Sequence, residues 1–69
     1  MSWLTNRYNK RSSKSLGWFP EWFGASGFDD DLARKIMEFQ RSRDLDVDGK
    51  CGPATYRRIL ADRELRSGQ

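Results

Sequence analysis

Three aspartates lie close together in the stretch DLDVDG. Asp44, Asp46 and Asp48, followed by Gly49, match the opening of an EF-hand calcium loop, D-x-D-x-D-G. Such a loop also needs a bidentate glutamate at its twelfth position. Counted from Asp44, the twelfth residue is Thr55, which has no carboxylate. We therefore predict solvated carboxylates and turn caps in this stretch, and no metal ion.

Side chains suited to catalysis are few. The chain of 69 residues has no histidine and one cysteine, so serine or cysteine nucleophiles lack their usual base, and zinc ligands are too few. Glu21 and Glu38 could form the carboxylate pair of a glycosidase, but so short a chain has little volume for a cleft. We expect no stand-alone enzymatic activity and no cofactor, and we interpret Cys51 as a small buried hydrophobe.

Two helical patterns flank the aspartate-rich stretch. The first begins at the aspartates of residues 29–31, one of which is a natural N-cap, and runs to about Arg43. Its apolar residues recur at helical spacing as Leu32, Ile36 and Phe39. The second begins at Pro53, which suits a first helical position, and runs to about residue 65 with a stripe of Tyr56, Ile59 and Leu60. In the intervening loop Leu45, Val47 and Cys51 are expected to point inward.

The N-terminal third is less regular. Residues 2–17 predict either a capping helix or a partly disordered arm, because asparagines and serines interrupt a short apolar face. Pro20, with glycines beyond it, predicts a short helix over residues 20–24. Trp18 and Trp22 are four residues apart, as are Phe19 and Phe23, so we expect each pair to stack. Either all four rings belong to the core, or an exposed tryptophan stacks on a sugar ring.

Charge is unevenly distributed. Residues 1–20 carry four basic and no acidic side chains, residues 21–50 carry a net −3, and residues 51–69 carry a net +2. The basic N-terminal region is either a solubilising arm or a surface for nucleic acid, anionic lipid or an anionic envelope polymer. No apolar run approaches the ~20 residues of a membrane span, and the first residues show no secretory signal.

The stretch FQRSRDLDVDGKCGPATYRRIL closely resembles the second half of the peptidoglycan-binding domain family. Its FQ, L-x-VDG and GP-x-T-aromatic elements are present with the family's spacing. Asp44 replaces the usual glycine before the leucine, and Cys51 stands where valine is common. The matching residues are Phe39, Gln40, Leu45, Val47, Asp48, Gly49, Gly52, Pro53, Thr55, Tyr56 and Ile59.

The resemblance implies a three-helix domain that holds a hydrolase on peptidoglycan, with a ligand groove beside the loop before the last helix. There the loop N–H groups and the helix start would meet a peptide-stem carboxylate. The alternative is that these residues cap turns, permit backbone geometry or fill the core. Candidate ligand residues are Asp48, Gly49, Gly52, Thr55 and Tyr56 at matching positions, with Arg57, Trp18 and Trp22 added for their chemistry.

Together these features predict a small all-α three-helix bundle with a structured loop between its last two helices. We expect a basic arm or capping helix over residues 1–15, a binding domain over 16–66, and a frayed end or linker over 67–69. The predicted function is non-catalytic binding of peptidoglycan, by stem or glycan, as the targeting part of a hydrolase such as a phage endolysin or amidase. The chain would be made in the cytoplasm without its own signal peptide and act at the cell wall.

The alternative function is a basic helical module that binds nucleic acid or another protein. The arginines of residues 57–66 favour nucleic acid, but the acidic middle of the chain would repel a phosphate backbone.

Overall fold

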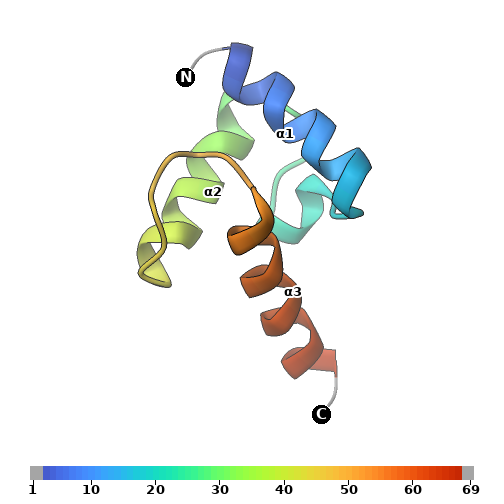
Figure 1. Ribbon diagram of the computed structural model, residues 1–69, viewed down its shortest axis with the longest axis vertical. Coiled ribbons are helices and arrows are strands. Elements are labelled where there is room, and N and C mark those ends of the chain that lie inside the picture. Colours follow the sequence, from blue (N-terminus) through green and yellow to red (C-terminus); the bar gives the residue numbers. More distant parts are fainter. Residues whose placement is uncertain (1–2, 68–69) are drawn as a thin grey trace.

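The structure is a computed structural model, and it describes residues 3–67. It contains the helices α1 (Trp3–Leu16), α2 (Asp30–Ser42) and α3 (Pro53–Ser67), with a 3-10 turn η1 (Pro20–Phe23) between the first two (Figure 1). The described residues contain no strand. The predicted all-α three-helix bundle is confirmed. The frayed end or linker was expected over residues 67–69. Residue 67 is the last residue of α3, and residues 68 and 69 lie outside the described residues.

The N-terminal region is helical from Trp3 to Leu16. α1 is attached to the rest of the molecule through polar side chains instead of an apolar stripe. Asn9 is fully buried, and the hydroxyl of Ser12 donates to the carbonyl of Cys51. The asparagines and serines that weakened the sequence pattern are therefore the residues that fix this helix in place.

The start of α2 follows the sequence expectation. Asp29 is the N-cap, and its carboxylate accepts a hydrogen bond of 3.0 Å from the backbone N–H of Leu32. Asp30 and Asp31 occupy the first turn, where their charge favours the positive end of the helix dipole. Phe28, directly before the cap, packs against the core. Leu32 and Ile36 are fully buried, as their spacing predicts.

The end of α2 is a Schellman motif. The N–H of Leu45 donates to the carbonyl of Gln40 at 2.9 Å, and that of Asp44 reaches the carbonyl of Arg41 at 3.4 Å. Asp44 takes the left-handed conformation this motif requires, with φ of 59°. Glycine adopts that conformation most easily, which accounts for the glycine that the family usually has at this position.

Trp18 is the centre of the core. Its ring is fully buried and meets Phe23 edge-on at 5.6 Å and Phe28 at 6.1 Å between centroids. The short helix expected at residues 20–24 is confirmed as η1, but the predicted ring pairs are wrong. Trp18 pairs with Phe23, and Phe19 pairs with Trp22 at 6.4 Å. The Phe19–Trp22 pair follows the 3-10 turn, which has about three residues per turn. Trp18 and Phe23 instead meet through packing in the core.

α3 joins the body at its first half and extends beyond it at its second (Figure 1). Ile59 is buried. Asp62 forms an ion pair with Arg43 at the end of α2, in which two guanidinium nitrogens each lie 2.8 Å from Asp62 Oδ2. Past this ion pair Leu65 is 68% exposed. The helix continues two residues beyond its predicted end at residue 65.

The loop between α2 and α3 differs from expectation at one apolar position. Cys51 is fully buried and Leu45 is half-buried, but Val47 is 41% exposed, so its predicted inward orientation is wrong. The next two residues, Asp48 and Gly49, turn their N–H groups towards α2. That backbone orientation leaves Val47 on the solvent side.

We predict that Asp44→Gly stabilises the protein by about 0.5–1 kcal/mol, because a non-glycine residue in the left-handed region carries a conformational cost. Chemical denaturation followed by circular dichroism measures the effect. Asp46→Gly is the matched control, since Asp46 lies two residues away and lacks a positive φ. Equal effects of the two substitutions, or destabilisation by Asp44→Gly, would contradict this account of the turn.

Candidate binding groove

A shallow groove lies between the loop and the start of α3. Its volume is about 380 Å³. One wall is formed by loop residues, the other by the first residues of α3, and Gln40 lies at its floor. The lining residues are Tyr8, Gln40, Asp44, Leu45, Asp46, Asp48, Lys50, Gly52, Pro53, Ala54 and Thr55.

Gln40 holds the loop against α2. Its side chain is almost completely buried, and its carbonyl oxygen accepts the N–H groups of both Asp48 and Gly49 at 3.0 Å. Its amide nitrogen lies 2.9 Å from Asp48 Oδ1, 3.0 Å from the carbonyl of Lys50 and 3.1 Å from Thr55 Oγ1. One side chain on α2 thus satisfies polar groups from both walls of the groove.

Asn9 holds the same loop from the other side. Its amide nitrogen donates to the carbonyl of Gly49 at 3.0 Å, and its oxygen accepts the N–H of Cys51 at 2.9 Å. A buried amide that makes both bonds is stabilising, whereas an unpaired one would cost about 1–3 kcal/mol. Gly49 lies between these supports with φ of 76°, so its role is backbone geometry.

The loop N–H groups are consequently occupied. The N–H groups of Asp48 and Gly49 donate to the side chain of Gln40. The N–H of Lys50 donates to the Asp48 carboxylate, and that of Cys51 donates to the Asn9 side chain. The N–H of Gly52 donates to the carbonyl of Lys50. We expected these groups to meet a ligand carboxylate, and that expectation is wrong. They hold the loop in shape, because the loop has no regular secondary structure to satisfy them.

The start of α3 contributes further backbone donors to the groove. Pro53 has no N–H, while Ala54 and Thr55 are in the first turn, where an N–H has no carbonyl partner within its own helix. No acidic residue stands in that turn, in contrast to the first turn of α2. The positive end of the α3 dipole therefore faces the groove without a carboxylate of its own.

The opposite rim of the groove is acidic. Asp44, Asp46 and Asp48 all line it, with Lys50 as the one basic neighbour in the lining. Among the described residues, no group of three acidic or cysteine side chains is placed to hold a metal ion. The Asp48 carboxylate instead accepts the Gln40 amide and the Lys50 N–H. The groove thus offers amide hydrogens from the start of α3 and carboxylates from the loop, and Asp48 and Thr55 both accept a hydrogen bond from the Gln40 amide.

The structure does not gather all the predicted site residues in this groove. Asp48, Gly52 and Thr55 line it, but Thr55 is buried with its hydroxyl bonded to Gln40. Gly49 is buried behind the lining. Arg57 is exposed and makes no ion pair with any described residue, but it is not part of the lining.

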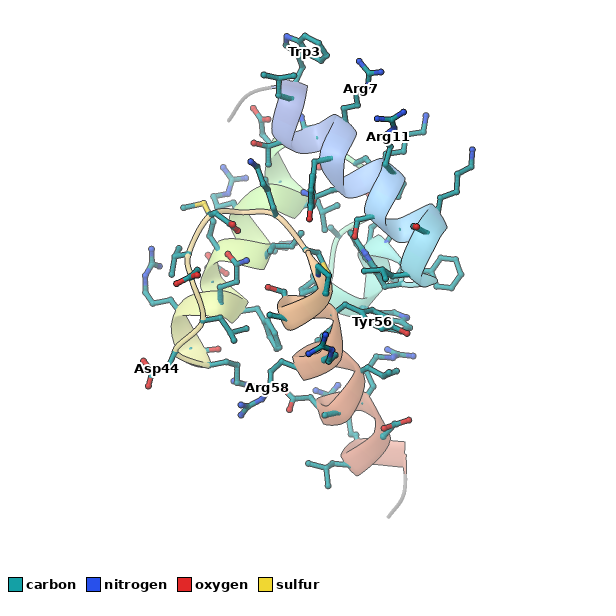
Figure 2. The ribbon with its side chains drawn as sticks, in the orientation of Figure 1. Trp3, Arg7, Arg11, Asp44, Tyr56 and Arg58 are labelled. Carbon is teal, nitrogen blue, oxygen red and sulfur yellow. The ribbon has the colours of Figure 1, made fainter. Side chains whose placement is uncertain are left out.

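The predicted aromatic residues lie elsewhere. Tyr56 points from α3 away from the loop (Figure 2) and stacks on Trp22, with 6.3 Å between centroids. The guanidinium of Arg63 lies 4.3 Å from the centroid of the Trp22 ring. Trp18 is fully buried, and its indole N–H donates to Ser12. The expectation that Trp18 stacks on a ligand is therefore wrong, because neither face of its ring is accessible.

Three residues that matter here were not among the predicted site residues. Gln40 was recognised only as part of the FQ pair, and Asn9 only as a weak helix former. Tyr8 lines the groove, and its hydroxyl lies against Gly52. A Cβ at position 52 would be only 2.9 Å from that hydroxyl oxygen, so a glycine is needed for Tyr8 to come this close. A polar stripe of Asn9, Ser12 and Ser13 at helical spacing was the available signal, since such a stripe on a basic arm implies a polar partner.

Reactive groups are scarce around the groove. Burial raises the pKa of the Cys51 thiol to about 12, so the thiol stays protonated and unreactive at neutral pH. Two of the four arginines of α3 are engaged within the fold, Arg58 with Asp62 at 3.6 Å and Arg63 with Trp22. Both observations favour a binding surface over a nucleophilic site or a row of free cations.

No helix in the described part of the chain has the length and apolar character to cross a membrane.

Comparison with known families supports this interpretation. A family model described as a peptidoglycan binding domain matches residues 14–59, two-thirds of the chain. The matched region runs from the last turn of α1 to the buried Ile59 and includes the groove-forming loop. No curated protein and no solved structure shows a significant match to the chain.

We predict that Gln40→Met destabilises the protein by about 3 kcal/mol, because it leaves the N–H groups of Asp48 and Gly49 without their acceptor. Urea denaturation followed by circular dichroism measures this loss. Glu38→Met, an exposed position on the same helix, is the control and should change stability by less than about 0.5 kcal/mol. If both variants were equally stable, Gln40 would not be holding the loop.

Proposed function

The chain belongs to the peptidoglycan-binding domain family, and we propose that it binds the peptide stem of peptidoglycan in the groove at the start of α3. Family membership implies that the domain acts at the cell wall. The observation that carries the choice of site is the first turn of α3, which faces the groove with N–H groups and no acidic residue. A ligand carboxylate would supply the missing negative charge.

The carboxylate would enter over Ala54. Its oxygens would accept the N–H groups of Ala54 and Thr55, in the manner of anions at helix N-termini. Lys50, whose ammonium lies 5.7 Å from the centroid of the Tyr8 ring, would add a cation to the groove. Because Gln40 and Asn9 already hold the loop, little conformational entropy would be lost on binding, which favours affinity.

The acidic rim suits a second feature of the ligand. Peptide stems carry an ammonium or amide group on the diamino residue as well as carboxylates. Asp44 and Asp46 are exposed, line the groove and make no ion pair with any described residue. They would attract such a group, while the start of α3 binds the carboxylate. Arg57, exposed in α3 directly after its first turn, would steer the anionic polymer towards the groove.

The aromatic shelf of Trp22, Tyr56 and Phe19 would contribute differently. Phe19 is 59% exposed beside Trp22. This shelf would contact a glycan ring if the glycan passes over η1, as the predicted role of Trp22 requires. We assign it a smaller share of the affinity, because Trp22 is already stacked on Tyr56 and covered by Arg63.

In a complete lytic system the domain would be a non-catalytic anchor. Its role would be to keep a peptidoglycan hydrolase, such as a phage endolysin or an amidase, close to its substrate. Tethering of this kind raises the effective concentration of the enzyme at the wall without contributing to the chemistry. The buried, protonated Cys51 and the absence of histidine from the sequence are consistent with that division of labour.

We predict that Ala54→Glu weakens binding to insoluble peptidoglycan sacculi by about tenfold or more. The new carboxylate would occupy the helix start and repel the ligand, a loss on the scale of one or two charge-assisted hydrogen bonds. The same change should leave the fold intact, since an acid near a helix N-terminus is stabilising. Co-sedimentation with sacculi across a range of protein concentrations gives the affinity.

The matched control is Ala61→Glu, an identical substitution at an exposed position further along α3. It changes the net charge equally but leaves the groove untouched, so its affinity should remain within about twofold of the parent chain. Equal weakening by both variants would mean that the groove is not the binding site. Failure of the parent chain to sediment with sacculi would refute the proposed function itself.

A further inference from the structure

Three of the four large apolar residues of α1 are exposed, and only Leu16, in its last turn, packs against the core. Its buried side carries Asn9, with Ser12 and Ser13 half-buried beside it. Trp3 is 66% exposed, Leu4 61% and Tyr8 40%. A helix that only capped the bundle would bury its large apolar side chains instead, since each gains about 1.5–3 kcal/mol from burial.

The same outer side carries all the charge of the helix. Arg7, Lys10, Arg11 and Lys14 are exposed and form no ion pair with any described residue, and the sequence of α1 contains no acid. Figure 2 shows Trp3, Arg7 and Arg11 projecting in a row away from the rest of the molecule. At about 100° per residue, the cations and apolar residues share one arc of about 160°. The residues of this cationic–apolar face are Trp3, Leu4, Arg7, Tyr8, Lys10, Arg11 and Lys14.

An apolar hollow adjoins this face. It has a volume of about 700 Å³ and lies between α1 and the first residue of α3. Its apolar lining residues are Leu4, Tyr8, Leu16 and Pro53, and its polar and charged lining residues are Arg7, Arg11, Ser12 and Ser15. The apolar residues of the face are therefore part of a continuous surface with cations beside it, and are not scattered singly.

From these features we propose that the outer face of α1 binds the surface of an anionic phospholipid bilayer. The cations would contact lipid phosphates, and Trp3 and Leu4 would enter the boundary between headgroups and acyl chains, as interfacial amphipathic helices do. A bilayer fits better than a soluble polyanion, because a polyanion would leave Leu4 and the apolar hollow uncovered. Nearly all of this face precedes residue 14, outside the region that the family model matches, so the proposal is independent of wall binding.

The test is co-sedimentation of the full chain with phosphatidylcholine vesicles that contain or lack phosphatidylglycerol, at low and moderate salt. We expect binding only to the anionic vesicles. Arg7→Gln combined with Arg11→Gln should weaken it about tenfold, from the loss of two phosphate contacts. Arg41→Gln combined with Arg66→Gln, two exposed arginines elsewhere, changes the net charge equally and should have an effect below about twofold.

Trp3→Ser separates insertion from simple charge attraction. This substitution should abolish the binding that persists at moderate salt. In the unsubstituted chain, lipids brominated on their acyl chains should quench the fluorescence of Trp3. Circular dichroism checks that each variant keeps its helices. Equal losses in the two double variants, equal binding to neutral vesicles, or full retention of binding in Trp3→Ser would each overturn the proposal. So would complete displacement by soluble polyphosphate at moderate salt, which would assign the face to a soluble polyanion.

Discussion

The structure depends on hydrogen bonds to the backbone N–H groups of a short loop that has no secondary structure of its own. Four consecutive N–H groups, from Asp48 to Cys51, are paired with side-chain oxygens. Two of the side chains that accept them, Asn9 and Gln40, are buried amides from different helices. Because an unpaired buried N–H is costly, the loop, α1 and α2 must come together in one arrangement. The groove beside α3 follows from that arrangement.

This constraint determines two distinct regions of the surface, the groove and the outer face of α1. The loop is held from behind by Gln40 and Asn9, so its front presents a rigid groove to which α3 contributes further backbone donors. The same contacts orient α1 with its polar side inward, which leaves its cations and apolar residues facing out. Tyr8 lines both the groove and the hollow beside α1. One helix thus both completes the wall-binding domain and presents a second surface.

Much of this could be predicted from the sequence where the signal was local. The cap at Asp29, the helix start at Pro53, the stripe of Leu32 and Ile36, and the short helix at Pro20 all depend on neighbours in the chain, and all are confirmed. What failed depends on distant residues. The pairing of Trp18 with Phe23 follows packing in the core instead of helical spacing, and Val47 was turned outward by the bonds that Gln40 makes to the next two residues.

The candidate site shows the same division. The family motif includes Thr55 and much of the loop that lines the groove, but it did not show that the loop N–H groups are used internally or that Tyr56 faces Trp22. The contribution of Asn9 was out of reach, because its bonds to Gly49 and Cys51 span about forty residues of sequence. The polar stripe of Asn9, Ser12 and Ser13 indicates a polar partner for residues 3–16, but it does not identify which backbone groups Asn9 binds.

The central claim is that buried amides hold the loop in a preformed groove, and amide hydrogen exchange followed by NMR tests it most directly. The N–H groups of Asp48, Gly49 and Cys51 should exchange as slowly as those in the middle of α2, although they lie outside any helix. In Gln40→Met the first two should lose their protection. Exchange of these amides at the rate of an unstructured chain in the unsubstituted protein would contradict the account.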